Sequence, residues 1–154
     1  MVEVLVLYYS RTGRTGVLAE AVAEGASSTE GVSATVKRVD YATVQDLISC
    51  DAMALGSPNY FSYMSGLMKD FFDRALSIRD RVSGKPAAAF TSGGGSSDSA
   101  LLSLEGMISS FKLEKAADGV VSEGTPTDEN IQACRNLGEA LAKAAIKRAE
   151  PPKE

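Results

Sequence analysis

Short apolar runs that alternate with amphipathic segments constrain the fold of this chain most strongly. One run covers residues 2–8 and is broken only by Glu3, and two more cover residues 51–55 and 87–91. Near-continuous apolar runs are typical of strands buried on both faces, as in parallel sheets. The segments between them have the apolar spacing of helices. Strands that alternate with helices imply right-handed βαβ units, so we expect an α/β fold with three layers, built as a doubly wound, five-stranded parallel sheet.

The predicted elements fill one domain. In chain order they are a strand at 2–8, a helix at 14–27, a strand at 32–39, a helix at 43–48, a strand at 51–55, a helix at 65–76, a strand at 87–91, a helix at 97–110, an irregular strand at 113–121 and a helix from 127 to about 149. We expect a single domain over residues 1–149 and a disordered tail at 150–154.

Composition excludes several classes of chemistry. The 154 residues include no histidine, which excludes His-based metal sites, Ser-His-Asp triads and Cys-His dyads. Cys50 and Cys134 show no metal-binding spacing, and we expect two buried, reduced thiols in a cytoplasmic protein. The net charge of −4 without a basic stripe predicts no nucleic-acid partner, and no apolar run reaches the about 18 residues of a membrane span.

The segment after the first predicted strand has the composition of a phosphate site. Its residues are Ser10, Arg11, Thr12, Gly13, Arg14 and Thr15. It joins a buried strand directly to a helix, whose first N–H groups lack partners and carry the positive end of the dipole. The three hydroxyl groups can each donate to a phosphate oxygen, and the glycine lets the backbone approach closely. We therefore expect a terminal phosphate here, with the two arginines either touching it or solvated.

Other readings of this segment fit less well. A P-loop requires GxxxxGK[ST], which is absent, and the dinucleotide fingerprint GxGxxG finds only Gly13 and Gly16. A single Ser or Thr would more simply cap the helix. Three hydroxyls around one glycine favour a monophosphate instead.

Two further loops follow buried strands and therefore share the same edge of the sheet. The second loop offers Ser57, Pro58, Asn59, Tyr60 and Phe61, followed by Tyr63 and Met64. The third offers Thr91, Ser92, Gly93, Gly94 and Gly95. Aromatic rings can cover a planar cofactor, and glycine N–H groups can serve its polar edge. Alternatively, the aromatics cover the core or an oligomer contact, and the glycines form only a flexible loop.

These loops resemble those of the flavodoxin-like, FMN-binding family. Residues 10–15 match the flavodoxin pattern [ST]-x-T-G-x-T at every specified position. Residues 56–61 and 64–66 are similar to the second flavin loop of NAD(P)H:quinone oxidoreductases related to tryptophan-repressor-binding protein. The resemblance implies strand order 2-1-3-4-5, one FMN, and flavin contacts from Asn59, Tyr60 and Phe61.

Two functions remain open, and the features divide between them. As an electron carrier the protein would exchange electrons with redox partner proteins, which suits its small size and acidic charge. As a reductase it would pass hydride from NAD(P)H through FMN to a quinone, which suits its second and third loops. The longer insertion and the flavin-contacting histidine of the quinone reductases are missing, as is the stacking tyrosine common in the third loop of flavodoxins. Carrier flavodoxins often have a glycine in the second loop, whose peptide flips to stabilise the one-electron-reduced flavin. No glycine occurs from Asn59 to Tyr63, and this favours two-electron chemistry. We expect no catalytic acid or base, and a homo-oligomer is possible.

Overall fold

The computed structural model describes residues 1–152. The strands are β1 (Val2–Tyr8), β2 (Val32–Arg38), β3 (Ala52–Pro58), β4 (Pro86–Gly93), β5 (Glu114–Lys115) and β6 (Val120–Glu123). The helices are α1 (Arg14–Ser27), α2 (Val44–Ser49), α3 (Gly66–Ala75), α4 (Ser97–Ser110) and α5 (Asp128–Ala149), with short 3₁₀ helices η1 (Val39–Tyr41) and η2 (Leu76–Arg81). Every ladder is parallel, in the order β2-β1-β3-β4-β5, with β6 also paired to β4. The predicted doubly wound sheet and its strand order are confirmed.

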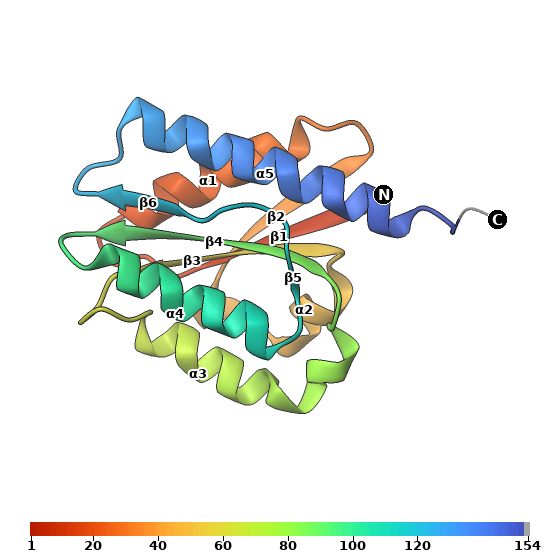
Figure 1. The fold of residues 1–154 in the computed structure, drawn as a ribbon, viewed down its shortest axis with the longest axis horizontal. Helices are drawn as coiled ribbons and strands as arrows, with labels where there is room; N and C mark the ends of the chain where they lie inside the picture. The colour runs from red at the N-terminus through yellow and green to blue at the C-terminus, as the bar shows by residue number, and fades with distance from the viewer. Residues whose placement is uncertain (153–154) are drawn as a thin grey trace.

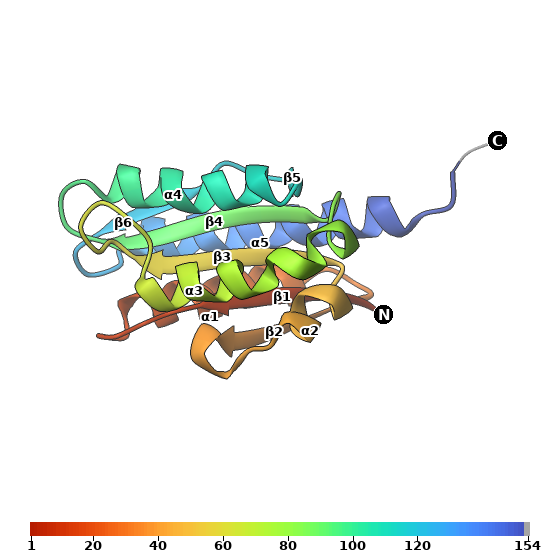
Figure 2. The same ribbon diagram turned by 90° about the horizontal axis from the view of Figure 1, so that it is seen from below.

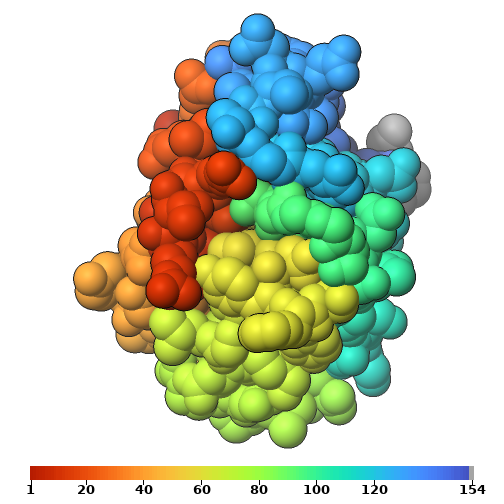
Figure 3. Space-filling model, turned by 90° about the vertical axis from the view of Figure 1, so that its left-hand side faces the viewer, coloured from red at the N-terminus to blue at the C-terminus, as the bar shows by residue number. Residues whose placement is uncertain are grey.

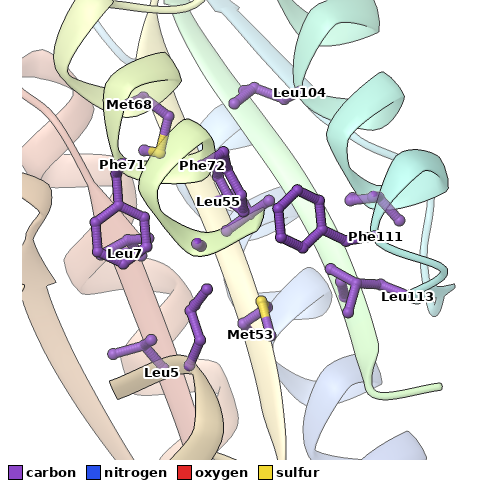
Figure 4. Packing of buried hydrophobic residues seen from close by; sticks show 14 of the residues in the cluster. Leu5, Leu7, Met53, Leu55, Met68, Phe71, Phe72, Leu104, Phe111 and Leu113 are labelled. Atoms are coloured by element: carbon purple, nitrogen blue, oxygen red, sulfur yellow. The ribbon is translucent and has the colours of Figure 1, made fainter. Parts of the chain in front are cut away.

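Helices cover both faces of the sheet and create three layers. Helices α1 and α5 pack on one face, and α2, α3 and α4 on the other (Figures 1 and 2). The α3–α4 side holds the larger side chains, including Phe71, Phe72 and Phe111 (Figure 4). The α1–α5 side is filled mainly by alanine and valine, so these two helices lie close together.

The fifth position of the sheet differs from the expected single strand at 113–121. Two short strands, β5 and β6, each pair with β4, and residues 116–119 between them leave the ladder. Asp118 and Gly119 are residues that favour turns over strands. A Cβ on Gly119 would lie 2.6 Å from the Leu101 side chain, so α4 crosses the chain closely at this break. Because β6 pairs parallel with β4, the carboxyl ends of both strands lie at the same edge of the sheet.

Helix capping explains several boundaries. Thr43 caps the start of α2 in a capping box with Asp46, and Thr127 caps the start of α5 in one with Asn130, although Glu or Gln is usual at that third helical position. Ser65 lies just outside α3 and accepts the Met68 N–H at 3.2 Å. The structure adds η1 and η2, which the sequence did not predict, and extends β3 and β4 beyond the predicted apolar runs.

Both cysteines are buried and free, as predicted. Burial raises the pKa of Cys50 to about 11, with Lys85 opposing, and raises the pKa of Cys134 to about 12. No helix within residues 1–152 is long and apolar enough to cross a membrane. Of the tail predicted to be disordered, Glu150 directly follows α5 as its C-cap residue, and residues 153–154 lie outside the described residues.

Candidate functional site

The sheet brings three loops together at the carboxyl ends of its strands. Strand β1 lies between β2 and β3, so the chain winds outward in both directions from it, and ligands of such sheets bind at this reversal. The first loop (residues 9–15), the second (57–65) and the third (91–97) lie side by side on this face, where they appear red, yellow and green (Figure 3). Two hydrogen bonds join them: Thr15 Oγ1 with Ser92 Oγ at 2.6 Å, which is buried, and the Asn59 N–H to the Ser92 carbonyl at 2.7 Å. The predicted clustering of the three loops is thus present.

The first loop turns sharply from β1 into α1. Gly13 is the residue before the helix, and its φ of 98° lies in the region that favours glycine. The Ser10 hydroxyl oxygen accepts the Gly13 and Gly16 N–H groups, at 3.1 and 3.3 Å. A hydroxyl that accepts two N–H groups keeps its own O–H to donate. Ser10 can therefore still offer a proton to an anion at this helix start.

The other residues of the first loop fall into two groups. Thr15 is buried and its hydroxyl bonds to Ser92, so it joins the first and third loops. Arg11, Thr12, Gly13 and Arg14 are exposed. Gly13 has no side chain to cap the first turn of α1, and Ser10 takes up only the Gly16 N–H of that turn, which leaves the Arg14 and Thr15 N–H groups for a ligand.

Arg38, at the end of β2, is a residue of this site that sequence reasoning missed. Its Nη1 donates to the Ser10 carbonyl at 2.7 Å, and its Nε and Nη2 donate to the Asp40 carboxylate at 3.1 and 3.2 Å. The guanidinium also lies over the Tyr9 ring, 5.4 Å from its centre. The contact depends on the pairing of β2 with β1, and no local motif marks it.

The second loop presents aromatic side chains on a tight hairpin. Tyr60 and Tyr63 exchange backbone hydrogen bonds of 2.9 and 3.1 Å. Phe61 and Ser62 at its tip have positive φ values of 55° and 66°, and the Phe61 side chain is fully exposed. Tyr60 packs edge-on against Tyr9. Partial burial, together with Tyr9, raises the pKa of Tyr60, while Arg11 acts to lower it.

Asn59 connects the second and third loops. Its side-chain amide donates to the Gly95 carbonyl at 2.8 Å and to Ser96 Oγ at 3.2 Å, and its side-chain oxygen accepts the Ser62 N–H at 2.9 Å. Ser62 and Ser96 also bond through their hydroxyls at 2.9 Å. Ser96, which has a φ of 68°, was missed in the sequence. The amide of Asn59 thus holds the two loops at a fixed spacing.

The remaining predicted residues line the site mainly with backbone. The side chains of Ser57 and Thr91 are fully buried and bond within the protein, Ser57 to the Ser65 N–H and Thr91 to the Ser57 carbonyl. Pro58 is partly buried at the end of β3. A Cβ built on Gly94 or Gly95 would meet nothing within 4 Å, so the third loop leaves open space above it.

These features fit an FMN molecule. The first loop supplies a free hydroxyl proton and helix N–H groups for a phosphate. The second and third loops supply flat aromatic faces beside an open, glycine-lined edge. Within residues 1–152, by contrast, no three His, Cys, Asp or Glu side chains gather into a metal site.

A separate hollow of about 420 Å³ lies at the opposite edge of the sheet, beside β5 and the end of α5. Its walls include Pro86, Ala116, Ala144, Lys147 and Arg148. It lies at the amino ends of the strands, where parallel sheets do not normally bind ligands. The three-loop face is therefore the stronger candidate.

Comparison with known proteins points to the same chemistry. The family model described as NADPH-dependent FMN reductase matches residues 40–113. A protein named flavodoxin from Aquifex aeolicus is 39% identical over 159 aligned positions, which cover 92% of this chain and 86% of the relative. A protein named NAD(P)H dehydrogenase (quinone) from Archaeoglobus fulgidus is 32% identical over 190 positions, covering 96% of this chain and 99% of the relative.

The fold agrees with these relatives. The structure of a flavodoxin from the domain Archaea superposes with a TM-score of 0.83 at 26% identity, covering 94% of this chain and 99% of that one. Relatives of this similarity over nearly the whole chain, with the matching strand order and loops, establish the family. The chain belongs to the flavodoxin-like family of FMN-binding redox proteins.

Proposed function

We propose that this protein is a one-domain electron carrier that holds FMN on the three-loop face and exchanges electrons with partner proteins. The observation that carries the proposal is the fit of chain length. The alignment with the flavodoxin relative takes 159 positions to cover 92% of this chain, whereas that with the quinone dehydrogenase takes 190 positions to cover 96% of it, so the second alignment contains more inserted residues. The second relative therefore has segments that this chain lacks, and such segments are what would complete a pocket for a second substrate.

The first loop would hold the phosphate end of FMN. The Ser10 O–H, the Thr12 hydroxyl and the Arg14 and Thr15 N–H groups would be the donors, and Gly13 lets them converge. Arg11 and Arg14 flank them as exposed cations. The buried Thr15 would act by fixing the third loop through Ser92.

The second and third loops would hold the ring. Tyr60 and Phe61 would lie against its faces, while Ser57, Pro58 and Thr91 shape the strand ends beneath it. Backbone N–H groups from Ser92 to Gly95 would face its polar edge, with Asn59 fixing their distance from the second loop. Bound FMN supplies the redox chemistry, because its ring accepts one or two electrons.

A reductase that uses NAD(P)H and a quinone is the second candidate. It is favoured by the match of residues 40–113 to the FMN reductase family model and by the quinone dehydrogenase relative. We expect no side chain to act as an acid or base in this reaction, so hydride transfer would depend on orientation alone.

Reduction under anaerobic conditions distinguishes the two candidates. The protein is loaded with FMN and mixed with NADPH or NADH, first alone and then with a quinone, and in parallel it is reduced with dithionite and mixed with oxidised cytochrome c. A carrier is slow to oxidise the nicotinamide and quick to reduce the cytochrome. Rapid, catalytic oxidation of NADPH in the presence of quinone would instead establish the reductase.

The partner would approach the three-loop face, where Phe61 and Tyr63 are exposed beside the site. We expect a redox partner protein here, and size-exclusion chromatography of the isolated protein tests the alternative of a second copy. The two free thiols suit a reducing compartment, which supports a cytoplasmic location.

A further inference from the structure

We propose that Arg38 is a positioning residue for the phosphate loop. Its guanidinium fixes the peptide between Ser10 and Arg11 so that the Arg11 N–H faces the site. This inference rests on the proposed phosphate position. Arg38 itself belongs to the neighbouring strand β2 and lies outside the motif at residues 10–15.

The guanidinium is held rigidly enough to orient a peptide. Two of its nitrogens bind the Asp40 carboxylate, and the third donates to the Ser10 carbonyl at 2.7 Å. The Tyr9 ring covers its face. Only one-third of the side chain is exposed. Each of the three guanidinium nitrogens thus donates a hydrogen bond, an arrangement that a lysine cannot reproduce.

The hydrogen bond to Ser10 decides which way the next N–H points. In a trans peptide the C=O and the following N–H point in opposite directions. The Ser10 carbonyl points toward Arg38 on the β2 side of β1, so the Arg11 N–H points toward the β3 side, where the second and third loops lie. Within residues 1–152 this N–H has no acceptor in the protein, which leaves it free for an anion.

Rotation of this peptide would reverse the effect. The Ser10 carbonyl would then face the phosphate position and repel its negative charge, and the Arg11 N–H would be lost as a donor. Since Asp40 neutralises the charge of Arg38, Arg38 contributes to phosphate binding by orienting the peptide and not as a free cation. The inference therefore predicts a defect that is specific for the phosphate and is not relieved by restoring charge.

The experiment compares FMN with riboflavin, which has the same ring but no phosphate, by quenching of flavin fluorescence at low and high salt. We expect Arg38→Met to weaken FMN binding about tenfold, the scale of one charge-assisted hydrogen bond, and to leave riboflavin binding within about twofold. Arg38→Lys should lose nearly as much FMN affinity as Arg38→Met. In both variants the Arg11 amide should exchange its hydrogen faster than in the wild-type protein. Arg79→Met is the matched control, because Arg79 also donates to a backbone carbonyl, that of Ser110, away from the site.

Three results would overturn the inference. Equal losses for both flavins would mean a general effect on the fold. Recovery of FMN affinity by Arg38→Lys would mean that charge alone matters. An unchanged FMN affinity in Arg38→Met would mean that the peptide between Ser10 and Arg11 keeps its orientation without Arg38. The wild-type protein separately tests the proposed function: if it binds FMN no better than riboflavin, the phosphate position itself is wrong.

Discussion

One glycine in each of helices α1 and α5 lets the two helices touch along their backbones. A Cβ on Gly138 would overlap the Val22 carbonyl oxygen and lie 2.8 Å from the Ala26 nitrogen. A Cβ on Gly25 would likewise overlap the Arg135 carbonyl and lie 2.8 Å from its Cα. Backbone cannot rotate aside as a side chain can, so Gly138→Ala must push the helices apart. This contact also fixes α1, whose first turn faces the binding site.

The expected cost follows from two opposing effects. Gly→Ala inside a helix normally stabilises a protein by about 0.5–1 kcal/mol, because alanine restricts the unfolded chain. Forcing an extra group into a close-packed interface costs about 1–3 kcal/mol. We expect the second effect to dominate for Gly138→Ala, with a decrease in melting temperature of roughly 2–10 °C for a chain of this size.

The control is Gly106→Ala in the exposed middle of α4, where a Cβ meets nothing within 4 Å. Urea unfolding of the apoprotein should show Gly106→Ala slightly more stable than wild type and Gly138→Ala clearly less stable. If Gly138→Ala is as stable as Gly106→Ala, the backbones of α1 and α5 do not pack in direct contact.

Three further predictions concern single groups. Asn59→Asp removes the amide donors that join the second and third loops, so it should weaken FMN and riboflavin about equally, by roughly tenfold, in fluorescence titrations; a loss for FMN alone would contradict this. The raised pKa values of Cys50 and Cys134 predict that neither thiol reacts with a disulfide reagent at pH 8 until guanidinium unfolds the protein, and rapid labelling of the folded protein would refute their burial. Burial acts to raise the pKa of Asp46, but the Thr43 N–H and the Lys37 ammonium outweigh it and the pKa is lowered. The ionised carboxylate therefore stabilises the fold above its unfolded pKa, and this stabilisation is lost as pH falls through the folded pKa. The loss of unfolding free energy caused by Asp46→Asn, measured with urea at pH 7, should therefore shrink below about pH 4. A loss that stays constant with pH would count against the assignment.

Local sequence was sufficient to predict the parts of the fold that depend on local composition. The buried strands β1, β3 and β4 are apolar runs, and the turn at Gly13 needs a residue that accepts a positive φ. Thr43 and Thr127 mark helix starts because a capping side chain bonds to its own helix. The three loops could be placed together because parallel strands share one carboxyl edge.

Contacts between distant segments could not be predicted in this way. Arg38 reaches Ser10 only because β2 pairs with β1 in register, and Ser96 meets Asn59 only because β3 pairs with β4. The break between β5 and β6 depends on how α4 crosses Gly119. Each follows from tertiary packing that leaves no periodic signal in the sequence.

The position of FMN can be mapped on the isolated protein by following its backbone amide NMR signals during an FMN titration. We expect a one-to-one complex on the three-loop face, with the largest changes at residues 10–15, 57–61 and 91–95. The amides around Pro86, Ala116 and Ala144 at the opposite hollow should stay nearly unchanged. Saturable changes at that hollow, with the three loops unaffected, would mean that FMN does not bind on the three-loop face.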